Sequence, residues 1–354
     1  MRSFIDYDIP ALAASLGASG LSPSHAVKLL RAYYRSVEAP DLILLKVGAR
    51  AAAWAESELA PIASRVAARS GSADGTIKLL MELGGGGAVE SVLMPSHRPD
   101  RAAGCVSSQV GCAMGCDFCA STRGGLDRNL AAREIVEQFL HLKDEAAAAG
   151  RRLTSLVFMG MGEPMHNLDN VTAAIRRIAD PNLGALGWRQ ITVSTVGIVP
   201  GIDRLADADL NVHLALSLHA PDDATRASLV PANRRYPVDE IMSAARRFAA
   251  RTGRVSTIEY CMLAGVNDSD EQADRLAELM RGFRAHVNLI PYNAIGAGIS
   301  GRRYERSSPQ RQAAFLSRLR AAGVVAHLRE TRGDDVAAAC GQLRRALVAP
   351  VRIT

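Results

Sequence analysis

The sequence predicts an α/β protein whose main domain is a partial (βα)6 barrel of the TIM-like type. The first observation is that short apolar runs alternate with helical stretches from about residue 103 onward. The second is that polar residues follow the ends of several of these runs, at the rim where barrels build their active sites. An open doubly wound sheet has the same rhythm, so periodicity alone leaves that alternative open.

Strands are expected in the runs CVSSQV, SLVFMG, ITVST, VHLALSLH, STIEYCML, HVNLIPYN and VVAHLRE. Between them, helices are expected at residues 131–148, 168–179, 238–252, 270–284 and 309–322. Each of these helices is long enough to return the chain across the sheet, as parallel strand pairing requires.

Two smaller parts precede the barrel. Residues 1–72 place apolar side chains at helical spacing, as in AVKLLRAYY, and predict a small helical domain. Residues 73–102 hold TIKLLMEL and AVESVLMP on either side of Gly84 to Gly87, which predicts a short β-hairpin extension. A phosphate-cradling loop at these glycines is less favoured because no helix follows them. The barrel is assigned to residues 103–345 and a tail to residues 346–354.

The composition is that of an ordinary globular protein. Hydrophobic residues make up 48% and charged residues 22% of the chain, which excludes a disordered or fibrous class. No segment matches a signal peptide or a membrane span, so we expect a cytoplasmic protein with no membrane contact. The net charge of +6 favours an anionic partner such as RNA, although a GC-rich genome also produces an arginine-rich chain.

Cysteines crowd into one segment in a way that indicates a metal site. Cys105, Cys112, Cys116 and Cys119 fall close together, and the last three have the spacing C-x3-C-x2-C in GCAMGCDFCAS. Thiolates at such spacing hold iron-sulfur clusters, and three ligands leave one iron of a four-iron cluster open. The alternative is a zinc site with Cys105 as fourth ligand, but Cys105 lies seven positions before Cys112, a spacing that suits no common zinc knuckle.

A second motif, FMGMGEP, follows the next predicted strand. Gly160 and Gly162 allow the backbone to approach a ligand closely, and Glu163 can accept hydrogen bonds from an amino group. The cysteine spacing and this segment, in this order, resemble the radical S-adenosylmethionine (SAM) superfamily. That resemblance implies a [4Fe-4S] cluster held by Cys112, Cys116 and Cys119, with SAM on the open iron.

A longer series of motifs is similar to the RlmN/Cfr family of radical SAM RNA adenine methyltransferases. The motifs are CVSSQVGC, MGMGEP, STVGIVP, LSLHAP, EYCMLAGVND, NLIPYN and TRGDDVAAACGQL, and the match runs from about residue 75 to 345. Adenine C2 and C8 are electron-poor carbons that cannot attack the methyl group of SAM, so a radical route is chemically necessary. The resemblance also implies that the amino-terminal helical domain contacts RNA.

The resemblance assigns the catalytic residues and two SAM molecules per turnover. Cys340 takes a methyl group from the first SAM as a thiolate, and the second SAM yields the radical that activates this methyl group for addition to adenine. Glu90 accepts the ring proton, and Cys105 attacks the Cys340 sulfur to release the product, leaving a transient disulfide. The SAM contacts carried over are Gly162, Glu163, Ser194, Ser217, Leu218, His219 and Asn293.

Other residues are left open or given a structural role. Cys261 has no matching catalytic position and is expected to pack in the core. Solvent exposure is favoured over RNA contact for each member of a set of candidate RNA-contacting residues. These candidates are His166, Tyr260, Arg302, Arg303 and Arg306.

The proline in MGMGEP and the TRGDD segment favour the C2-methylating RlmN branch over the C8-methylating Cfr branch. The resemblance then implies 23S rRNA as substrate, with tRNA modified next to the anticodon. A flavodoxin- or ferredoxin-type electron donor and a monomeric state are also expected. The alternatives are a Cfr-type C8 enzyme conferring antibiotic resistance, a radical SAM enzyme with a non-RNA substrate, and a non-catalytic zinc-binding RNA module.

Overall fold

The computed structural model describes residues 1–343, and its centre is a ten-stranded mixed sheet. Seven of its strands pair in parallel and follow one another in chain order across the sheet. They are β6 (Arg101–Cys105), β9 (Arg152–Phe158), β10 (Ile191–Thr195), β11 (His213–Ser217), β12 (Ser256–Met262), β13 (Ala285–Pro291) and β14 (Ala326–Leu328). A doubly wound sheet would reverse its strand order, so this order confirms the barrel-like α/β fold.

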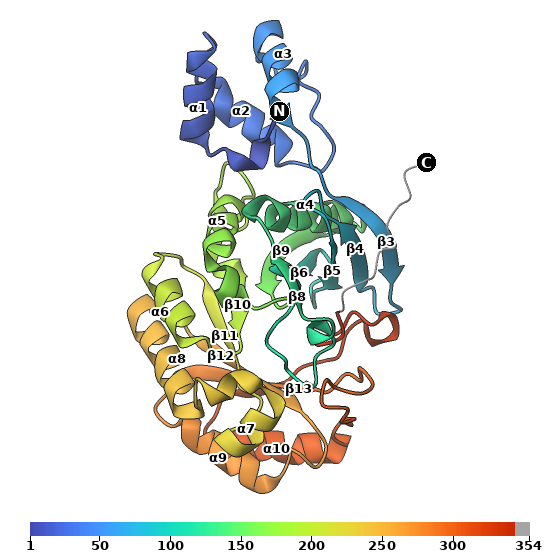
Figure 1. The fold of residues 1–354 in the computed structure, drawn as a ribbon, viewed down its shortest axis with the longest axis vertical. Helices are drawn as coiled ribbons and strands as arrows, with labels where there is room; N and C mark the ends of the chain where they lie inside the picture. The colour runs from blue at the N-terminus through green and yellow to red at the C-terminus, as the bar shows by residue number, and fades with distance from the viewer. Residues whose placement is uncertain (344–354) are drawn as a thin grey trace.

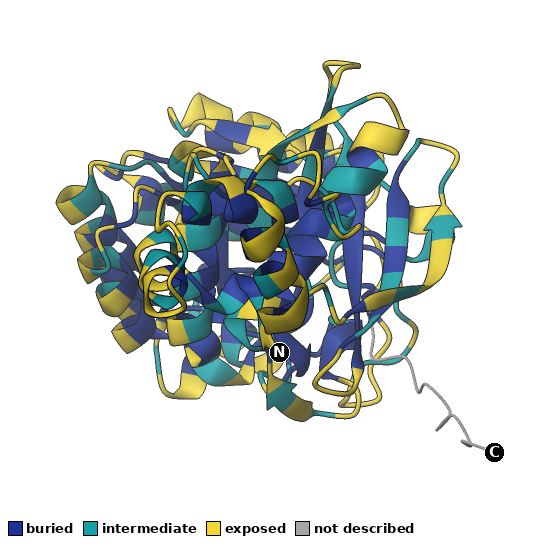
Figure 2. Ribbon diagram, turned by 90° about the horizontal axis from the view of Figure 1, so that it is seen from above, coloured by how far each residue is buried: buried dark blue, intermediate teal, exposed yellow. Residues whose placement is uncertain are grey.

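The connecting helices lie on the outer side of the curved sheet (Figure 1). They are α4 (Ala132–Ala148), α5 (Leu168–Ala179), α6 (Val199–Asp207), α7 (Asp223–Leu229), α8 (Val238–Thr252), α9 (Asp270–Met280) and α10 (Pro309–Ala321). The sequence predicts five of these and misses α6 and α7, which are short. Helix α5 buries Leu168, Val171, Ile175 and Ile178, at the spacing of one helical face. Figure 2 shows the buried residues concentrated in the sheet and the helix faces turned toward it.

The extension before the barrel has three antiparallel strands, one more than the hairpin that the sequence predicts. These are β3 (Arg65–Gly71), β4 (Ile77–Glu82) and β5 (Ala88–Pro95), and β5 pairs with β6 to continue the main sheet. Strand β3 lies inside residues 1–72, which the sequence assigns to the helical domain. The glycines between β4 and β5 form the expected turn, with φ of 85° at Gly86 and 79° at Gly87.

The amino-terminal part contains α1 (Ile9–Ala18), α2 (His25–Tyr33) and α3 (Ala49–Glu58), with a small pair of strands, β1 (Arg2–Ser3) and β2 (Leu59–Ala60). Side chains of α4 and α5 hold it against the barrel. Lys143 donates to the Tyr34 carbonyl at 2.9 Å, and Arg177 donates to the Ile5 carbonyl at 2.6 Å. No helix among residues 1–343 is long and apolar enough to cross a membrane.

The expected first barrel strand, CVSSQV, is divided between two sheets. Strand β6 ends at Cys105, and β7 (Gln109–Gly111) pairs instead with β8 (Leu126–Asn129) in a separate two-stranded ribbon. Short 3-10 helices occur at Phe4–Asp6, Ala120–Thr122, Pro164–Asn167, Trp188–Gln190, Pro231–Arg234 and Asp334–Val336. The predicted tail, residues 346–354, lies outside the described residues.

Candidate active site

The loop between β7 and β8 brings Cys112, Cys116 and Cys119 to one cavity, which we call the cysteine cavity. Its other walls come from residues just past the carboxyl ends of β9, β10 and β11 and from the inner face of β12. All three thiols are free, and each lies at the rim where a partial barrel places its reacting groups. The predicted grouping of the three cysteines is therefore present in the fold.

Glycines give this loop its path. Gly111 has φ of 77°, and a Cβ atom there would lie 2.0 Å from the carbonyl oxygen of Gly125, the residue just before β8. Gly124 also has positive φ, at 90°, but a Cβ atom there would have nothing within 4 Å. The two glycines therefore differ in one respect: a side chain at Gly111 meets backbone, whereas one at Gly124 meets open space.

We expect Gly111→Ala to push the β7–β8 ribbon apart and to reduce the iron retained per chain by more than about half, because the clash is with a carbonyl that cannot move alone. The measurement is iron content after anaerobic reconstitution. Gly124→Ala is the matched control, since it carries only the backbone strain of a left-handed residue, about 1 kcal/mol, and leaves the loop in place. Equal iron loss in both variants would contradict this role for Gly111.

The cysteine cavity fits an iron-sulfur cluster better than a zinc ion. Burial raises the pKa of Cys112 to about 12 and that of Cys116 well above its usual value, and the neighbouring cysteine thiolates add to both shifts. Such thiols ionise when a metal supplies positive charge. A zinc site would also need Cys105, which lines a different cavity.

Glu163 is buried in the wall of the cysteine cavity. Its two carboxylate oxygens accept hydrogen bonds from the backbone N–H groups of Met165 at 3.0 Å and Val196 at 2.9 Å. Burial raises its pKa to about 7, so a cationic amino group would favour its ionised form. A Cβ atom on Gly162 would lie 2.5 Å from Gln109, so the glycine lets this segment pack against the strand that leads into the cysteine loop.

Short polar groups from the next strands complete this wall. The hydroxyls of Ser194 and Ser217 lie 3.3 Å apart at the ends of β10 and β11. Nδ1 of His219 accepts from the Cys261 backbone N–H at 3.0 Å, and burial lowers the pKa of this histidine to about 3. His219 is therefore neutral with its proton on Nε2, from which it can donate to a ligand.

Two of the residues expected to contact SAM do not line the cysteine cavity. Leu218 is fully buried and does not line the cysteine cavity. Asn293 lines the neighbouring cavity, where its side-chain amide donates to the Cys340 carbonyl at 3.2 Å and its oxygen accepts from Arg306 at 2.8 Å. In this structure Asn293 holds the Cys340 segment, so any contact of its side chain with SAM would require these bonds to change.

Arg226 is a buried charge that sequence reasoning missed. Its side chain is 0% exposed, and it donates to the backbone carbonyls of Leu218 at 2.9 Å, Val196 at 2.5 Å and Ser217 at 3.3 Å. It also donates to the Asn233 side-chain oxygen at 2.9 Å. One guanidinium thus fixes the backbone just past β10 and β11, where the polar groups of the cysteine cavity stand.

Arg226→Met should lower the free energy of unfolding by at least about 3 kcal/mol, because several buried carbonyls lose their donor and each costs about 1–3 kcal/mol. Chemical denaturation followed by circular dichroism measures this change. Arg251 is exposed and serves as the control. Arg251→Met should change the free energy of unfolding by no more than about 0.5 kcal/mol. A similar decrease in the free energy of unfolding for both variants would contradict the role of Arg226 in fixing this backbone.

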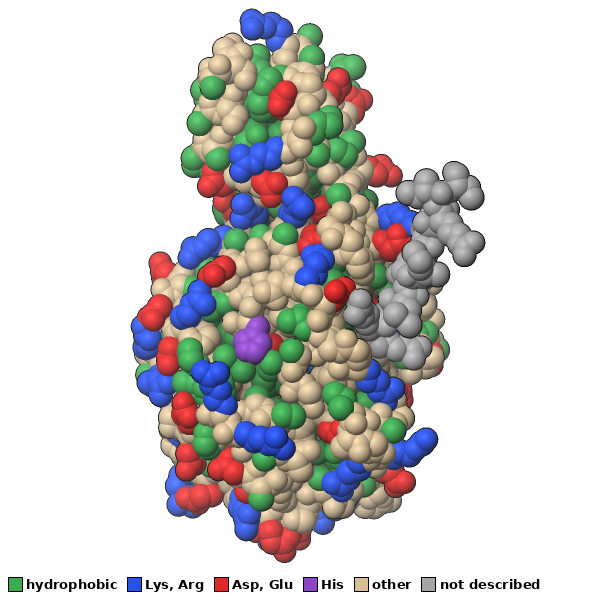
Figure 3. All heavy atoms as spheres, viewed as in Figure 1, with side chains coloured by type: hydrophobic (Ala, Val, Ile, Leu, Met, Phe, Trp, Pro, Cys, Tyr) green, Lys and Arg blue, Asp and Glu red, His purple; other side chains and the backbone are tan. Residues whose placement is uncertain are grey.

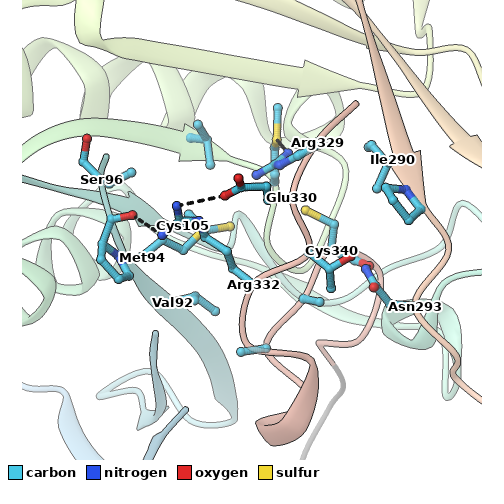
Figure 4. Close-up of a pocket in the computed structure, with 18 of the residues that line it drawn as sticks. Val92, Met94, Ser96, Cys105, Ile290, Asn293, Arg329, Glu330, Arg332 and Cys340 are labelled. Carbon is cyan, nitrogen blue, oxygen red and sulfur yellow. Dashed lines mark hydrogen bonds and ion pairs between the residues drawn. The ribbon is translucent and has the colours of Figure 1, made fainter. Parts of the chain in front are cut away.

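A second cavity, of about 500 Å³, adjoins the cysteine cavity at the open side of the barrel. It is lined by the ends of β5 and β13, by residues 327–332, and by both Cys105 and Cys340 (Figure 4). Cys340 also lines the cysteine cavity, so its side chain stands between the two. Both thiols are free here, and no disulfide joins them. The fold thus brings together two cysteines that lie far apart in the sequence.

The segment that carries Cys340 is tied to the cysteine loop and to the antiparallel extension. The Gly341 carbonyl accepts from the Ala120 N–H at 2.7 Å, and Lys78 donates to the Ala337 carbonyl at 3.2 Å. Lys78 also forms an ion pair with Glu90 at 2.9 Å. Glu90 is buried on the same face of β5 as Val92, which lines the second cavity, but Glu90 is not itself a lining residue.

The structure also tests the residues considered for RNA contact and shows an anchor, Asp117, for the loop that carries three of them. Tyr260 is 0% exposed and donates to the Asn267 carbonyl at 2.6 Å, so the favoured expectation of solvent exposure and the alternative of RNA stacking are both wrong for this residue. Asp117 accepts hydrogen bonds from Ser300 and Tyr304, which ties the loop carrying the candidate arginines to the cysteine loop. A carboxylate placed between two cysteines, in CDFC, was the available sequence signal for this anchor.

Comparisons with known proteins agree with this geometry. Residues 106–277 match the family model described as the Radical SAM superfamily. The chain is 54% identical to a protein of Opitutus terrae named "Probable dual-specificity RNA methyltransferase RlmN 1", over 97% of this chain and 96% of that protein. It is 46% identical to a protein of Heliobacterium modesticaldum named "Probable dual-specificity RNA methyltransferase RlmN", over 98% of this chain and 89% of the relative.

A solved structure is also similar along nearly the whole chain. The crystal structure of a radical SAM methyltransferase from Sphaerobacter thermophilus has a TM-score of 0.89 and 42% sequence identity. The match covers 97% of this chain and 99% of that one. With relatives of this identity and coverage, the chain belongs to the RlmN family of radical SAM RNA methyltransferases.

Proposed function

We propose that this protein methylates C2 of an adenosine in 23S rRNA, and of an adenosine next to the anticodon in tRNA, through a methyl group carried on Cys340. The observation that supports this most directly is that Cys340 lines both the cysteine cavity and the second cavity. A side chain in that place can receive a methyl group on one side and present it to a base on the other.

Cys112, Cys116 and Cys119 would hold the [4Fe-4S] cluster, and Glu163, Ser194, Ser217 and His219 would bind SAM beside it. When bound, the reduced cluster and SAM supply the radical that removes a hydrogen atom from the methylated Cys340. Glu163 offers an anionic acceptor for the SAM amino group, and neutral His219 offers a donor. The buried walls keep water from the reacting carbon.

Cys340 first attacks the SAM methyl group as a thiolate, so that a carbon–sulfur bond forms as the sulfonium bond breaks. After the activated carbon has joined adenine, the adduct must give up one electron, which a bound cluster would accept, and Glu90 takes the ring proton. Cys105 then attacks the Cys340 sulfur, so that a disulfide forms as the carbon–sulfur bond breaks, and the departing carbon takes up a proton to become the methyl group of the base. A cellular dithiol then reduces the resulting disulfide. Glu90 lies beside the second cavity and forms an ion pair with Lys78 at 2.9 Å.

The relatives' RlmN names favour adenine C2 over C8 as the carbon that is methylated. On the face shown in Figure 3, basic side chains are interspersed with acidic ones, so this face carries no broad basic patch. RNA selection would then depend on the second cavity and the arginine-bearing loop near Arg302 and Arg303. We further propose a cytoplasmic monomer that receives electrons from a flavodoxin- or ferredoxin-type protein.

The test is mass spectrometry of nucleosides from 23S rRNA and tRNA after incubation with reconstituted enzyme, SAM and a reductant. RNA from cells that lack the modification is the substrate, because the acceptor carbon must be free. We expect 2-methyladenosine. Formation of 8-methyladenosine would assign the protein to the C8 reaction, and absence of both products, with the cluster intact and SAM cleaved, would overturn the proposal.

A further inference from the structure

Four polar side chains surround the segment that carries Cys340, and we call them the Cys340 clamp. They are Asn293 and Arg306, which follow β13, and Asp334 and Gln342, which flank Cys340. Asn293 donates to the Cys340 carbonyl at 3.2 Å (Figure 4), and its oxygen accepts from Arg306 at 2.8 Å. The same nitrogen of Arg306 forms an ion pair with Asp334 at 3.3 Å. Nε of Arg306 donates to the Tyr292 carbonyl at 2.7 Å, which anchors this pair directly after β13.

Gln342 closes a ring of hydrogen bonds on the other side of Cys340. Its side-chain oxygen accepts from the backbone N–H of Ala339 at 3.1 Å. Its side-chain nitrogen donates to Asp334 at 2.8 Å and to the Ala294 carbonyl at 3.4 Å. Hydrogen bonds therefore run without a break from the residue before Cys340, through all four clamp residues, to the carbonyl of Cys340 itself. Because both ends of this buried amide are bonded, only one orientation of Gln342 satisfies them.

The clamp acts on Cys340 without entering either cavity at this point. Gln342 and Asp334 line neither cavity, whereas Cys340 lines both. The Gly341 carbonyl accepts from the Ala120 N–H at 2.7 Å, so the residue after Cys340 is also held to the cysteine loop. Backbone groups on both sides of Cys340 are thus fixed, and the place of its sulfur depends on them. A misplacement of about 1 Å can slow a reaction between positioned groups about a hundredfold.

We propose that Gln342, oriented by Asp334, is a positioning residue that sets the place of the Cys340 sulfur between the two cavities. This inference rests on the proposed function and adds to it a residue that touches neither the SAM site nor the base site. In the step that it serves, the thiol proton leaves to water, and the sulfur bonds to the methyl carbon as the sulfonium bond of SAM breaks.

Exchanging donor and acceptor between Gln342 and Asp334 tests this proposal. Gln342→Glu keeps the shape of the side chain but removes the donor, so that two carboxylates face each other in place of a hydrogen bond of 2.8 Å. Asp334→Asn in the same chain supplies a donor from the other side and leaves an oxygen that can accept from Arg306. The double variant therefore forms the same hydrogen bonds as the wild type, with one of them reversed.

The first measurement is the rate at which saturating SAM methylates Cys340 in the reconstituted enzyme without RNA, followed by peptide mass spectrometry. We expect Gln342→Glu to slow it about tenfold or more, because repulsion replaces a hydrogen bond to a carboxylate. Asp334→Asn alone breaks one bond at a half-exposed position and should slow it about threefold. The double variant should return to within about twofold of the wild type, because its hydrogen bonds form again. Iron content and the SAM concentration at half-maximal rate should not change.

Gln272→Glu is the matched control, since Gln272 donates to Asp222 at 2.9 Å in an amide–carboxylate pair outside both cavities. It should leave the rate of Cys340 methylation within about twofold of the wild type. Equal slowing by Gln272→Glu, or a double variant no faster than Gln342→Glu, would overturn the inference. A wild-type rate in both Gln342→Glu and Asp334→Asn would also overturn it.

Hydrogen exchange of the peptide that spans Cys340 is a second readout, and it requires no turnover. Exchange should be faster in Gln342→Glu than in the wild type, because the ring that holds this backbone is broken. It should be slow again in the double variant. Unchanged exchange in Gln342→Glu would show that the clamp does not hold the segment.

Methylation of RNA separates this inference from the proposed function. If the wild type methylates adenine while the clamp variants methylate Cys340 normally, the function is correct and the role of Gln342 is wrong. If the wild type methylates Cys340 but no RNA, and Gln342→Glu slows the first step, the clamp positions the sulfur of an enzyme with another substrate. A wild type that never methylates Cys340 would overturn both.

Discussion

Cys340→Ala should reduce methyl transfer to RNA roughly a thousandfold or more, because the variant lacks the sulfur that carries the methyl group between the two cavities. The [4Fe-4S] cluster should remain, since Cys340 is not one of the three cysteines in the loop between β7 and β8. SAM binding should also remain close to that of the wild type. Methyladenosine yield, iron content and SAM affinity measure these three quantities separately.

Cys261→Ala provides a comparison within the same cavity. Cys261 is buried and free, and it acts on His219 through its backbone N–H, which alanine keeps. This variant should retain most of the methyl transfer. If Cys340→Ala still methylates RNA at a comparable rate, the methyl group must travel from SAM to adenine without passing through this sulfur.

The sequence predicts local features of the fold well. Helices α4, α5, α8 and α10 begin and end within one residue of their expected positions, because amphipathic spacing and chain breaks are local signals. The cysteine loop and the Gly162–Glu163 segment are also predicted, since each is a short motif after a predicted strand. These parts require no knowledge of what lies opposite them in the fold.

The sequence does not predict features that depend on residues far apart in the chain. Arg226 gives no local signal, because the carbonyls that accept its hydrogen bonds come from two other strand ends. Asn293 is expected to bind SAM, but it bonds to the Cys340 segment, whose position only the folded chain reveals. Glu259, which lines the cysteine cavity, does carry a usable local signal, because it is a charged residue within the apolar run STIEYCML.

Cys105→Ala should cause RNA to accumulate as a covalent adduct with the protein, because the second thiol that frees the product would be absent. The resting structure explains how Cys105 is held back before that step. Burial, and then the neighbouring Cys340, raises the pKa of Cys105 to about 12, so Cys105 stays protonated at neutral pH. Once Cys340 carries the methyl group it can hold no charge, and one cause of the raised pKa disappears.

The adduct should appear as labelled RNA that migrates with protein on a denaturing gel, and nuclease digestion should leave a nucleotide on the peptide containing Cys340. The double variant Cys105→Ala, Cys340→Ala should form no adduct, which shows whether the bond is at Cys340. Turnover of Cys105→Ala at the wild-type rate would mean that another thiol releases the product. An added small thiol should partly restore release, because Cys105 and Cys340 both line a cavity of about 500 Å³ that can admit it.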